Sequence, residues 1–207
     1  MSAGAAIPHD RALGAARALV ELLAADCERV EIAGSLRRGK PEVHDIEIVA
    51  LPRIEPMPEG LFGEVLANRL DMRVAALLEL DGSGLQARYV ENQRADGSTD
   101  VQTKMGSAFK ALVWQGIPVD LFAVIPPATW GVIFALRTGP GDWNIELVTR
   151  CKDIGRRVAG GQVERWNGHA WETVPTPEAA DFFAAIGQPW VEPADRHPSR
   201  VGITRPA

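Results

Sequence analysis

Two acidic residues separated by a single residue, Asp45 and Glu47, are the feature of this sequence that most directly suggests chemistry. On a β-strand, residues two apart project from the same face, so the two carboxylates would lie side by side. Like charges at this spacing repel, and a divalent cation would neutralise them; hard oxygen ligands favour Mg²⁺ or Mn²⁺. The alternative is the solvated face of an edge strand, which the pair alone does not exclude.

A third acidic residue, Asp120, lies in the otherwise apolar run 117–124. A carboxylate buried there without a partner would be costly. A structural salt bridge could stabilise Asp120, or Asp120 could join Asp45 and Glu47 from a neighbouring strand. The second arrangement would complete a metal site of three carboxylates.

A basic turn precedes the carboxylate pair. Gly34 and Ser35 offer backbone N–H groups and a hydroxyl, and Arg37 and Arg38 add guanidinium groups suited to phosphate. Alone, such a turn is a common surface feature. Followed by paired carboxylates on the next strand, it predicts a site that holds a triphosphate beside its metal ions.

These motifs resemble the signature of the nucleotidyltransferase superfamily, and more narrowly that of family X DNA polymerases, the group that includes DNA polymerase beta. Residues 34–40 with Asp45 resemble the palm of these enzymes, and residues 117–121 resemble their third-carboxylate strand. Further on, Thr138 and Gly139 with Asn144 resemble the thumb segment that contacts the incoming nucleotide. The resemblance extends to residues 192–196 and so covers nearly the whole chain.

The resemblance implies a reaction, its site residues and its cofactors. The reaction would transfer a nucleotidyl group from a (deoxy)nucleoside triphosphate to a primer 3′-hydroxyl. Two Mg²⁺ ions, or Mn²⁺ in their place, would serve as cofactors. The catalytic and metal-binding residues would be Asp45, Glu47 and Asp120. The nucleotide-binding residues would be Gly34, Ser35, Arg38, Thr138, Gly139 and Asn144.

The sequence departs from the family pattern in three places. Glu47 stands where a second Asp is usual, which leaves a preference for Mn²⁺ open. Leu136 and Arg137 replace the aromatic pair that presses on the sugar, so we expect weaker rejection of ribonucleotides. Pro140 follows Gly139 where the family has Ser, and because cis is cheap only before proline, we expect a cis bond there.

Six tryptophans invite a base-stacking interpretation, but we expect most of them to serve packing. Trp143 is the one retained as a candidate contact with the nascent base pair. The family's lyase and fingers modules are not recognised in the chain. Because the formal net charge is −5, we expect primer-template DNA to be bound weakly, with an accessory protein as a candidate partner.

Length and composition limit the number of domains, the degree of disorder and the location of the protein. A chain of 207 residues with 46% hydrophobic content fits one large or two small folded domains and excludes wholesale disorder. No apolar run approaches about 20 residues, and residues 1–10 lack signal-peptide features, so no membrane partner is expected. Two cysteines favour a reducing, cytoplasmic location, and four scattered histidines make a zinc site improbable.

The periodicity predicts an α+β fold. The resemblance to family X polymerases implies that residues 1–125 form a nucleotidyltransferase palm, a mixed or antiparallel sheet with flanking helices, and that residues 126–207 form a small α/β thumb. Helices are predicted at 10–25, 61–80, 129–136, 143–158 and 177–186, the last with Pro177 at its first position. Strands are predicted at 29–33, 44–51, 85–91, 109–114, 117–124, 162–166 and 169–174. Residues 52–60 would be a linker, and 92–106 a polar loop or a long hairpin tip.

Two other functions stay open. The chain could transfer nucleotides to a non-DNA acceptor, such as an RNA end, a protein or a small molecule. It could also be a non-catalytic nucleotide-binding module that keeps the fold. The joint presence of three acidic positions with Ser35 and Arg38 argues against the second, because each is hard to explain by structure alone.

Overall fold

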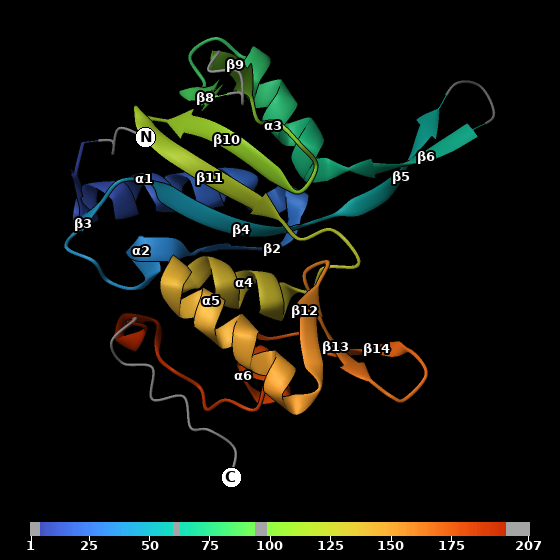
Figure 1. The fold of residues 1–207 in the computed structure, drawn as a ribbon. Coiled ribbons are helices and arrows are strands. Elements are labelled where there is room, and N and C mark those ends of the chain that lie inside the picture. Colours follow the sequence, from blue (N-terminus) through green and yellow to red (C-terminus); the bar gives the residue numbers. More distant parts are fainter. Residues whose placement is uncertain (1–4, 60–62, 94–98, 198–207) are drawn as a thin grey trace. The chain divides into compact units, whose positions relative to one another are not determined.

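The computed structural model describes residues 5–59, 63–93 and 99–197. The chain divides into two compact units, each described here by itself (Figure 1). The first comprises Met1–Ile32 and Pro41–Ala123, and the second comprises Ala33–Lys40 and Val124–Ala207. Both units contain helices and strands, and the fold is α+β. The basic segment at 33–40 therefore groups with the carboxy-terminal half of the chain.

The first unit is built on a five-stranded mixed sheet in the order β2-β4-β11-β10-β7. The central strands β4 and β11 run parallel, and all other neighbours are antiparallel. The apolar run predicted as a strand is β11, whose central position explains its hydrophobicity. The strands are β2 (Cys27–Ile32), β4 (Ile46–Pro52), β7 (Leu85–Ala87), β10 (Phe109–Trp114) and β11 (Ile117–Ala123).

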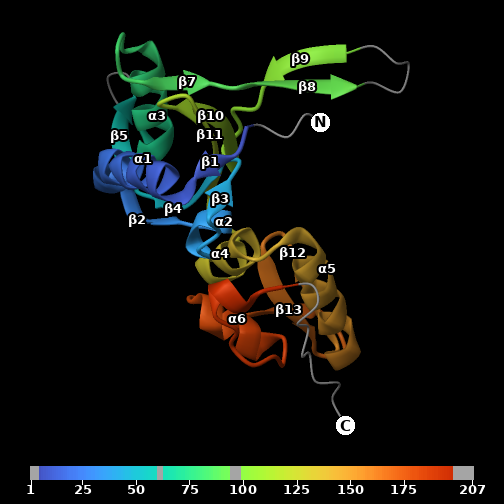
Figure 2. The ribbon, with the colours of Figure 1, turned by 90° about the vertical axis from the view of Figure 1, so that its left-hand side faces the viewer.

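Two helices, α1 (His9–Leu23) and α3 (Arg69–Glu79), cover one face of this sheet (Figures 1 and 2). On that face the side chains of the central strands are fully buried, and the Trp114 indole N–H donates to the Ala15 carbonyl of α1 at 3.0 Å. The buried residues of the central strands are Ile46, Ile48, Val119 and Leu121. Because side chains alternate along a strand, Glu47 and Asp120 project from the opposite face.

Two hairpins extend the first unit. Residues predicted as a linker and a helix start instead form β5 (Ile54–Glu59) and β6 (Gly63–Asn68), and residues 60–62 lie outside the described part. Prolines suggested a linker, but a two-stranded ribbon tolerates proline because each strand has an open edge. The helix begins only at Arg69, where the Asn68 side chain accepts from the Asp71 amide.

The second hairpin pairs β8 (Tyr89–Gln93) with β9 (Thr99–Thr103), which confirms a hairpin rather than a loop in 92–106. The predicted strand at 85–91 is therefore divided between β7 and β8. A separate two-residue pairing joins β1 (Ile7–Pro8) to β3 (Glu42–Val43).

In its described residues, the second unit combines four helices with a three-stranded antiparallel sheet. Its helices are α2 (Gly34–Arg37), α4 (Trp130–Thr138), α5 (Gly141–Arg150) and α6 (Ala179–Ala185). Its strands are β12 (Arg156–Ala159), β13 (Gln162–Trp166) and β14 (Trp171–Val174). Helix α4 packs against α6, and a Cβ at Gly131 would overlap the backbone of Thr176 and Glu178. Short 3₁₀ turns also occur at Ala24–Asp26, in the first unit, and at Cys151–Ile154 and Pro193–Asp195, in the second.

Two helix predictions in this unit were wrong at their ends. The helix predicted at 143–158 ends at Arg150, because the left-handed Gly155 turns the chain into strand β12. The helix predicted from Pro177 begins at Ala179, with Glu178 at its N-cap and the Glu178 amide donating to Asp181 Oδ2 at 2.9 Å. Pro177 therefore precedes the cap rather than occupying the first helical position.

Among the residues that the structure describes, Arg196 is the largest fully buried side chain, and it is only 1% exposed. Its guanidinium lies 5.0 to 5.5 Å from the ring centroids of Trp143, Phe183 and Trp190, and it donates to the carbonyls of Val191 and Ala135. Burial, and then the charge of Arg37, lower the pKa of Arg196 to about 10, so it stays charged at neutral pH. Arg196 thus anchors the final described turn to the helices of the second unit.

Both cysteines are buried as free thiols. Burial raises the pKa of Cys27 and of Cys151 to about 11. At neutral pH both thiols are therefore protonated and poor nucleophiles. Within the described ranges, no helix has the length and apolarity needed to cross a membrane.

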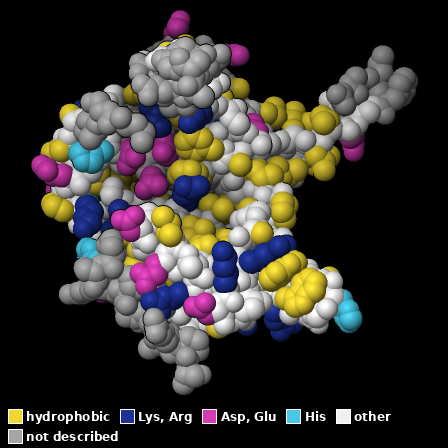
Figure 3. Space-filling view, in the orientation of Figure 1, with side chains coloured by type: hydrophobic (Ala, Val, Ile, Leu, Met, Phe, Trp, Pro, Cys, Tyr) yellow, Lys and Arg dark blue, Asp and Glu magenta, His cyan; other side chains and the backbone are white. Residues whose placement is uncertain are grey.

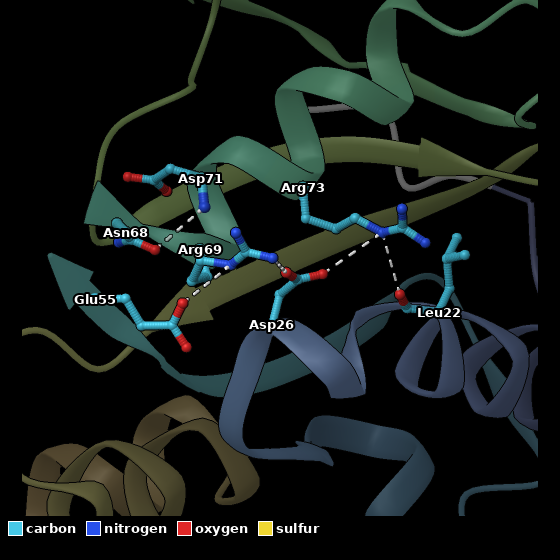
Figure 4. Close-up of polar contacts among 7 residues, drawn as sticks. All are labelled: Leu22, Asp26, Glu55, Asn68, Arg69, Asp71 and Arg73. Carbon is cyan, nitrogen blue, oxygen red and sulfur yellow. Dashed lines mark hydrogen bonds and ion pairs between the residues drawn. The ribbon is translucent and has the colours of Figure 1, made fainter. Parts of the chain in front are cut away.

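An ionic cluster around Asp26 ties α3 to the end of α1 (Figure 4). The Asp26 carboxylate is largely buried and lies 3.2 Å from Arg69 Nη2 and 3.6 Å from Arg73 Nε. Arg73 also donates to the Leu22 carbonyl at 3.4 Å, whereas Arg69 reaches the more exposed Glu55 only at 3.8 Å. Asp26 is therefore the central acceptor of the cluster.

We expect Asp26→Asn to lower the free energy of unfolding by about 1–3 kcal/mol, because the amide carries no negative charge and sets an NH2 group, instead of an acceptor oxygen, against one of the two arginines. Urea denaturation followed by circular dichroism measures this change. Glu55→Gln is the matched control and should shift stability by less than about 0.5 kcal/mol, since that ion pair is long and exposed. Equal effects of the two substitutions would contradict the central role of Asp26.

Candidate functional site: a carboxylate row on the central strands

Two of the predicted carboxylates lie beside each other. In the parallel pairing of β4 with β11, Asp120 is the direct partner of Glu47. Both side chains project from the face opposite the helices, and the Asp120 side chain is 24% exposed to solvent. Asp45 directly precedes β4, and because Ile46 and Ile48 are buried, Asp45 and Glu47 fall on the alternate, half-buried positions.

Arg88, which no sequence motif singles out, completes this row. Its backbone N–H donates to the Ala111 carbonyl at 2.9 Å, and Ala111 is in turn the strand partner of Asp120. The Arg88 guanidinium forms an ion pair with the Asp120 carboxylate across the small Ala111 side chain. The row thus runs Arg88, Ala111, Asp120, Glu47 over neighbouring strands. Only the strand register reveals it.

The donor chemistry of this row suits a hard divalent cation, since Asp45, Glu47 and Asp120 offer only carboxylate oxygens. As the side chains stand, however, no group of three or more His, Cys, Asp or Glu residues in the described part is arranged to hold a metal ion. Asp120 faces Arg88 instead. A cation at this row would therefore compete with Arg88 for the Asp120 carboxylate.

We expect Arg88→Gln to strengthen Mn²⁺ binding about fivefold or more, because a competing positive charge is removed from Asp120. Titration followed by electron paramagnetic resonance of free Mn²⁺ measures this affinity without any need for activity. Arg11→Gln, an exposed arginine of α1, is the control and should leave the affinity unchanged. Unchanged or weaker Mn²⁺ binding by Arg88→Gln would contradict a cation site at Asp120.

The predicted phosphate-binding residues lie in the second unit, in one turn of helix. Gly34 has a left-handed φ of 63°, which favours glycine at the point where the chain enters α2. Arg38 Nη1 donates to the Thr138 carbonyl at 2.6 Å, and the Arg37 guanidinium lies 4.4 Å from the Phe134 ring centroid. Both arginines thereby attach α2 to α4, and Ser35 lies between them and Gly34 with partial exposure.

The predicted thumb residues Thr138, Gly139 and Asn144 lie together at the junction of α4 and α5. Asn144 Nδ2 donates to the carbonyls of Leu136 and Gly139, at 2.5 and 3.0 Å. A Cβ at Gly139 would overlap the Asn144 side chain, so the junction requires glycine. The buried Oδ1 of Asn144 accepts no hydrogen bond from the described part of the chain. In the structure the Asn144 amide thus serves the junction between α4 and α5, and a nucleotide contact by Asn144 stays a prediction.

Two further expectations at this junction were wrong. The Gly139–Pro140 bond is trans, and among the described residues only Pro126–Pro127 is cis. Pro140 serves as the N-cap of α5, with its carbonyl accepting from the Asn144 amide, and this needs only ordinary extended geometry. Trp143 is 2% exposed and packs against Phe183 and Arg196, so it is a core residue rather than an accessible base contact.

We expect Asn144→Asp to lower the free energy of unfolding by about 1–3 kcal/mol, because a carboxylate cannot donate to the two carbonyls that the amide holds. Thermal or urea unfolding measures this loss. Gln188→Glu makes the same amide-to-acid change at a partly exposed site in the same unit and should have little effect. Native stability in Asn144→Asp would show that the junction does not depend on this amide.

Comparison with models of known protein families found no match, and comparison with curated proteins found no significant match. The resemblance to family X polymerases therefore rests on the motif residues, and the roles it implies stay predictions.

Proposed function

We propose that the chain is a metal-dependent nucleotidyltransferase, a minimal family X-like DNA polymerase that extends a primer 3′-hydroxyl. The observation that carries the proposal is the direct pairing of Asp120 with Glu47 on parallel central strands. Together with Asp45, this gives three carboxylates on a face that the sheet's own helices leave open. In this proposal the first unit serves as the palm and the second as a thumb.

The chemistry follows from the donor set. Held by Asp45, Glu47 and Asp120, a pair of Mg²⁺ or Mn²⁺ ions would activate the attacking hydroxyl and neutralise charge on the transferred phosphate. Asp120 would accept the proton of the primer hydroxyl or orient it. Ser35 and Arg38, with the backbone of Gly34, would bind the β- and γ-phosphates of the nucleoside triphosphate. Primer-template DNA would be bound weakly, because the net charge of −5 opposes it.

One observation favours a second candidate, a non-catalytic nucleotide-binding module. The ion pair between Arg88 and Asp120 satisfies the Asp120 charge without a metal ion. In a binding module this ion pair would be permanent and structural. In a transferase the Arg88 guanidinium would move away from Asp120 when the cation binds.

Primer extension separates the candidates. We expect incorporation of labelled nucleotide with Mg²⁺ or Mn²⁺ on templated DNA primers, and loss of activity by about a hundredfold or more in Asp120→Asn. Asp81→Asn, in an exposed turn of the same unit, is the matched control and should retain activity. If Leu136 and Arg137 replace the aromatic pair that presses on the sugar, as the resemblance implies, the preference for deoxynucleotides over ribonucleotides should stay below about a thousandfold.

The acceptor is tested in the same assay. Incorporation on RNA ends or on protein, but not on DNA primers, would favour a non-DNA acceptor. Nucleotide binding by the wild-type chain without incorporation on any acceptor and with either metal ion would favour the binding module and contradict the proposal.

A further inference from the structure

The ribbon β5–β6 of the first unit exposes apolar side chains to solvent. Because side chains alternate along a strand, the register places Ile54, Pro56 and Leu66 on one face of the ribbon. Ile54 and Leu66 are 46% and 72% exposed, and hydrophobic side chains gather over this ribbon in Figure 3. Two strands alone are marginally stable in water, whereas a larger sheet with an apolar face is stable. The ribbon therefore has the properties of a segment that gains stability from a partner.

The prolines of β5 determine which backbone groups each edge of the ribbon presents. Proline has no N–H group, so Pro56 and Pro58 fit the ladder only where backbone groups point away from the neighbouring strand. Their strand partners, Leu66 and Glu64, then point their own N–H and C=O groups away from β5. The outer edge of β5 thus lacks two donors, whereas the outer edge of β6 keeps the donors of both partners.

The two edges of the ribbon are therefore protected unequally. Proteins commonly block an exposed strand edge with proline, lysine or a covering segment, because an open edge pairs with other chains. Two prolines block β5, but residues 63–68 of β6 contain neither proline nor lysine. In the described part of the chain, β5 is the only strand that pairs with β6. The edge of β6 is thus left available for a further strand.

We propose that β6 pairs with β6 of a second copy of the chain, antiparallel and about a two-fold axis at Leu66. The outward-pointing positions of β6 would form the hydrogen-bonded pairs of the new ladder. Leu66 would then lie opposite its counterpart, and Glu64 would lie opposite Asn68 of the other copy. On the other face of the ribbon, Val65 would lie opposite Ala67. Apolar residues would meet apolar residues, and no like charges would meet.

The ribbon itself favours a second copy over an unrelated strand. Its open edge is complementary to itself in the register that the prolines impose, so one surface supplies both halves of the interface. The blocked edge of β5 would end the pairing at two copies, because no further strand could add there. The product would be a four-stranded sheet in the order β5-β6-β6-β5. This dimer does not involve the carboxylate row and is independent of the proposed transferase activity.

Sedimentation velocity of the full chain over a range of concentrations tests the proposal, and we expect a monomer–dimer equilibrium. Leu66→Pro removes an outward N–H group that the β5–β6 ladder does not use, and it should weaken dimerisation by about tenfold or more. Ile54→Pro is the matched control, because it removes an outward N–H group from an exposed apolar position on the blocked edge. Ile54→Pro should dimerise like the wild type, and circular dichroism checks the fold of both variants.

Cysteine crosslinking tests the register without a proline substitution. Directly paired residues have Cα atoms about 5.5 Å apart, within the range of a disulfide. Leu66→Cys should therefore crosslink the two copies on mild oxidation, whereas Val65→Cys should crosslink much less. The wild type gives the background, because Cys27 and Cys151 are both buried.

Three results would overturn the proposal. The first is a wild-type chain that is monomeric at every concentration, or that forms assemblies larger than two copies. The second is a dimer of equal stability in the wild type and in folded Leu66→Pro. The third is crosslinking of Val65→Cys that equals or exceeds that of Leu66→Cys, which would exclude a two-fold axis at Leu66.

Discussion

The register between β4 and β11 is the constraint on which the carboxylate row depends. Parallel pairing sets Asp120 against Glu47, and the fully buried Ile46, Ile48, Val119 and Leu121 hold that register by filling the space under α1 and α3. A slip of one residue would turn β11 over, burying Asp120 and exposing its neighbours. The hydrophobic core thus positions the acidic residues, although none of its members has a chemical role.

The carboxylate row also depends on electrostatics, because neighbouring carboxylates repel each other and need a nearby positive charge. Arg88 offsets part of this repulsion through its ion pair with Asp120. The guanidinium passes over the small side chain of Ala111, and a larger side chain at position 111 would obstruct this contact. The same guanidinium that stabilises the row also occupies an oxygen that a cation would need. In the proposed transferase, Arg88 would therefore link folding to ligand binding, because it would have to leave the Asp120 carboxylate when a metal ion binds there.

Local pattern was sufficient to predict the acidic pair, the central apolar strand and the helices at both ends of the chain, since each has a clear period or spacing. Local pattern failed where tertiary context overrides local preference. The prolines at 56 and 58 indicated a linker, but they lie in the two-stranded ribbon β5–β6. The apolar periodicity predicted a helix as far as residue 158, but the helix ends at Arg150, before the left-handed turn at Gly155. Arg88 could not be found from sequence because its partner is thirty-two residues away and is brought near only by pairing of three strands. Burial of Trp143 and exposure of Trp166 likewise depend on packing that spacing does not encode.

The central claim is that the acidic row binds divalent cations in place of Arg88. The most direct measurement is a crystal structure of the chain grown with Mn²⁺ and a non-hydrolysable nucleoside triphosphate, with anomalous scattering used to locate the metal. The account predicts anomalous peaks bound by Asp120, Glu47 and Asp45, with the Arg88 guanidinium displaced from Asp120. Arg88 still paired with Asp120, and no peak at these carboxylates despite bound nucleotide, would contradict it.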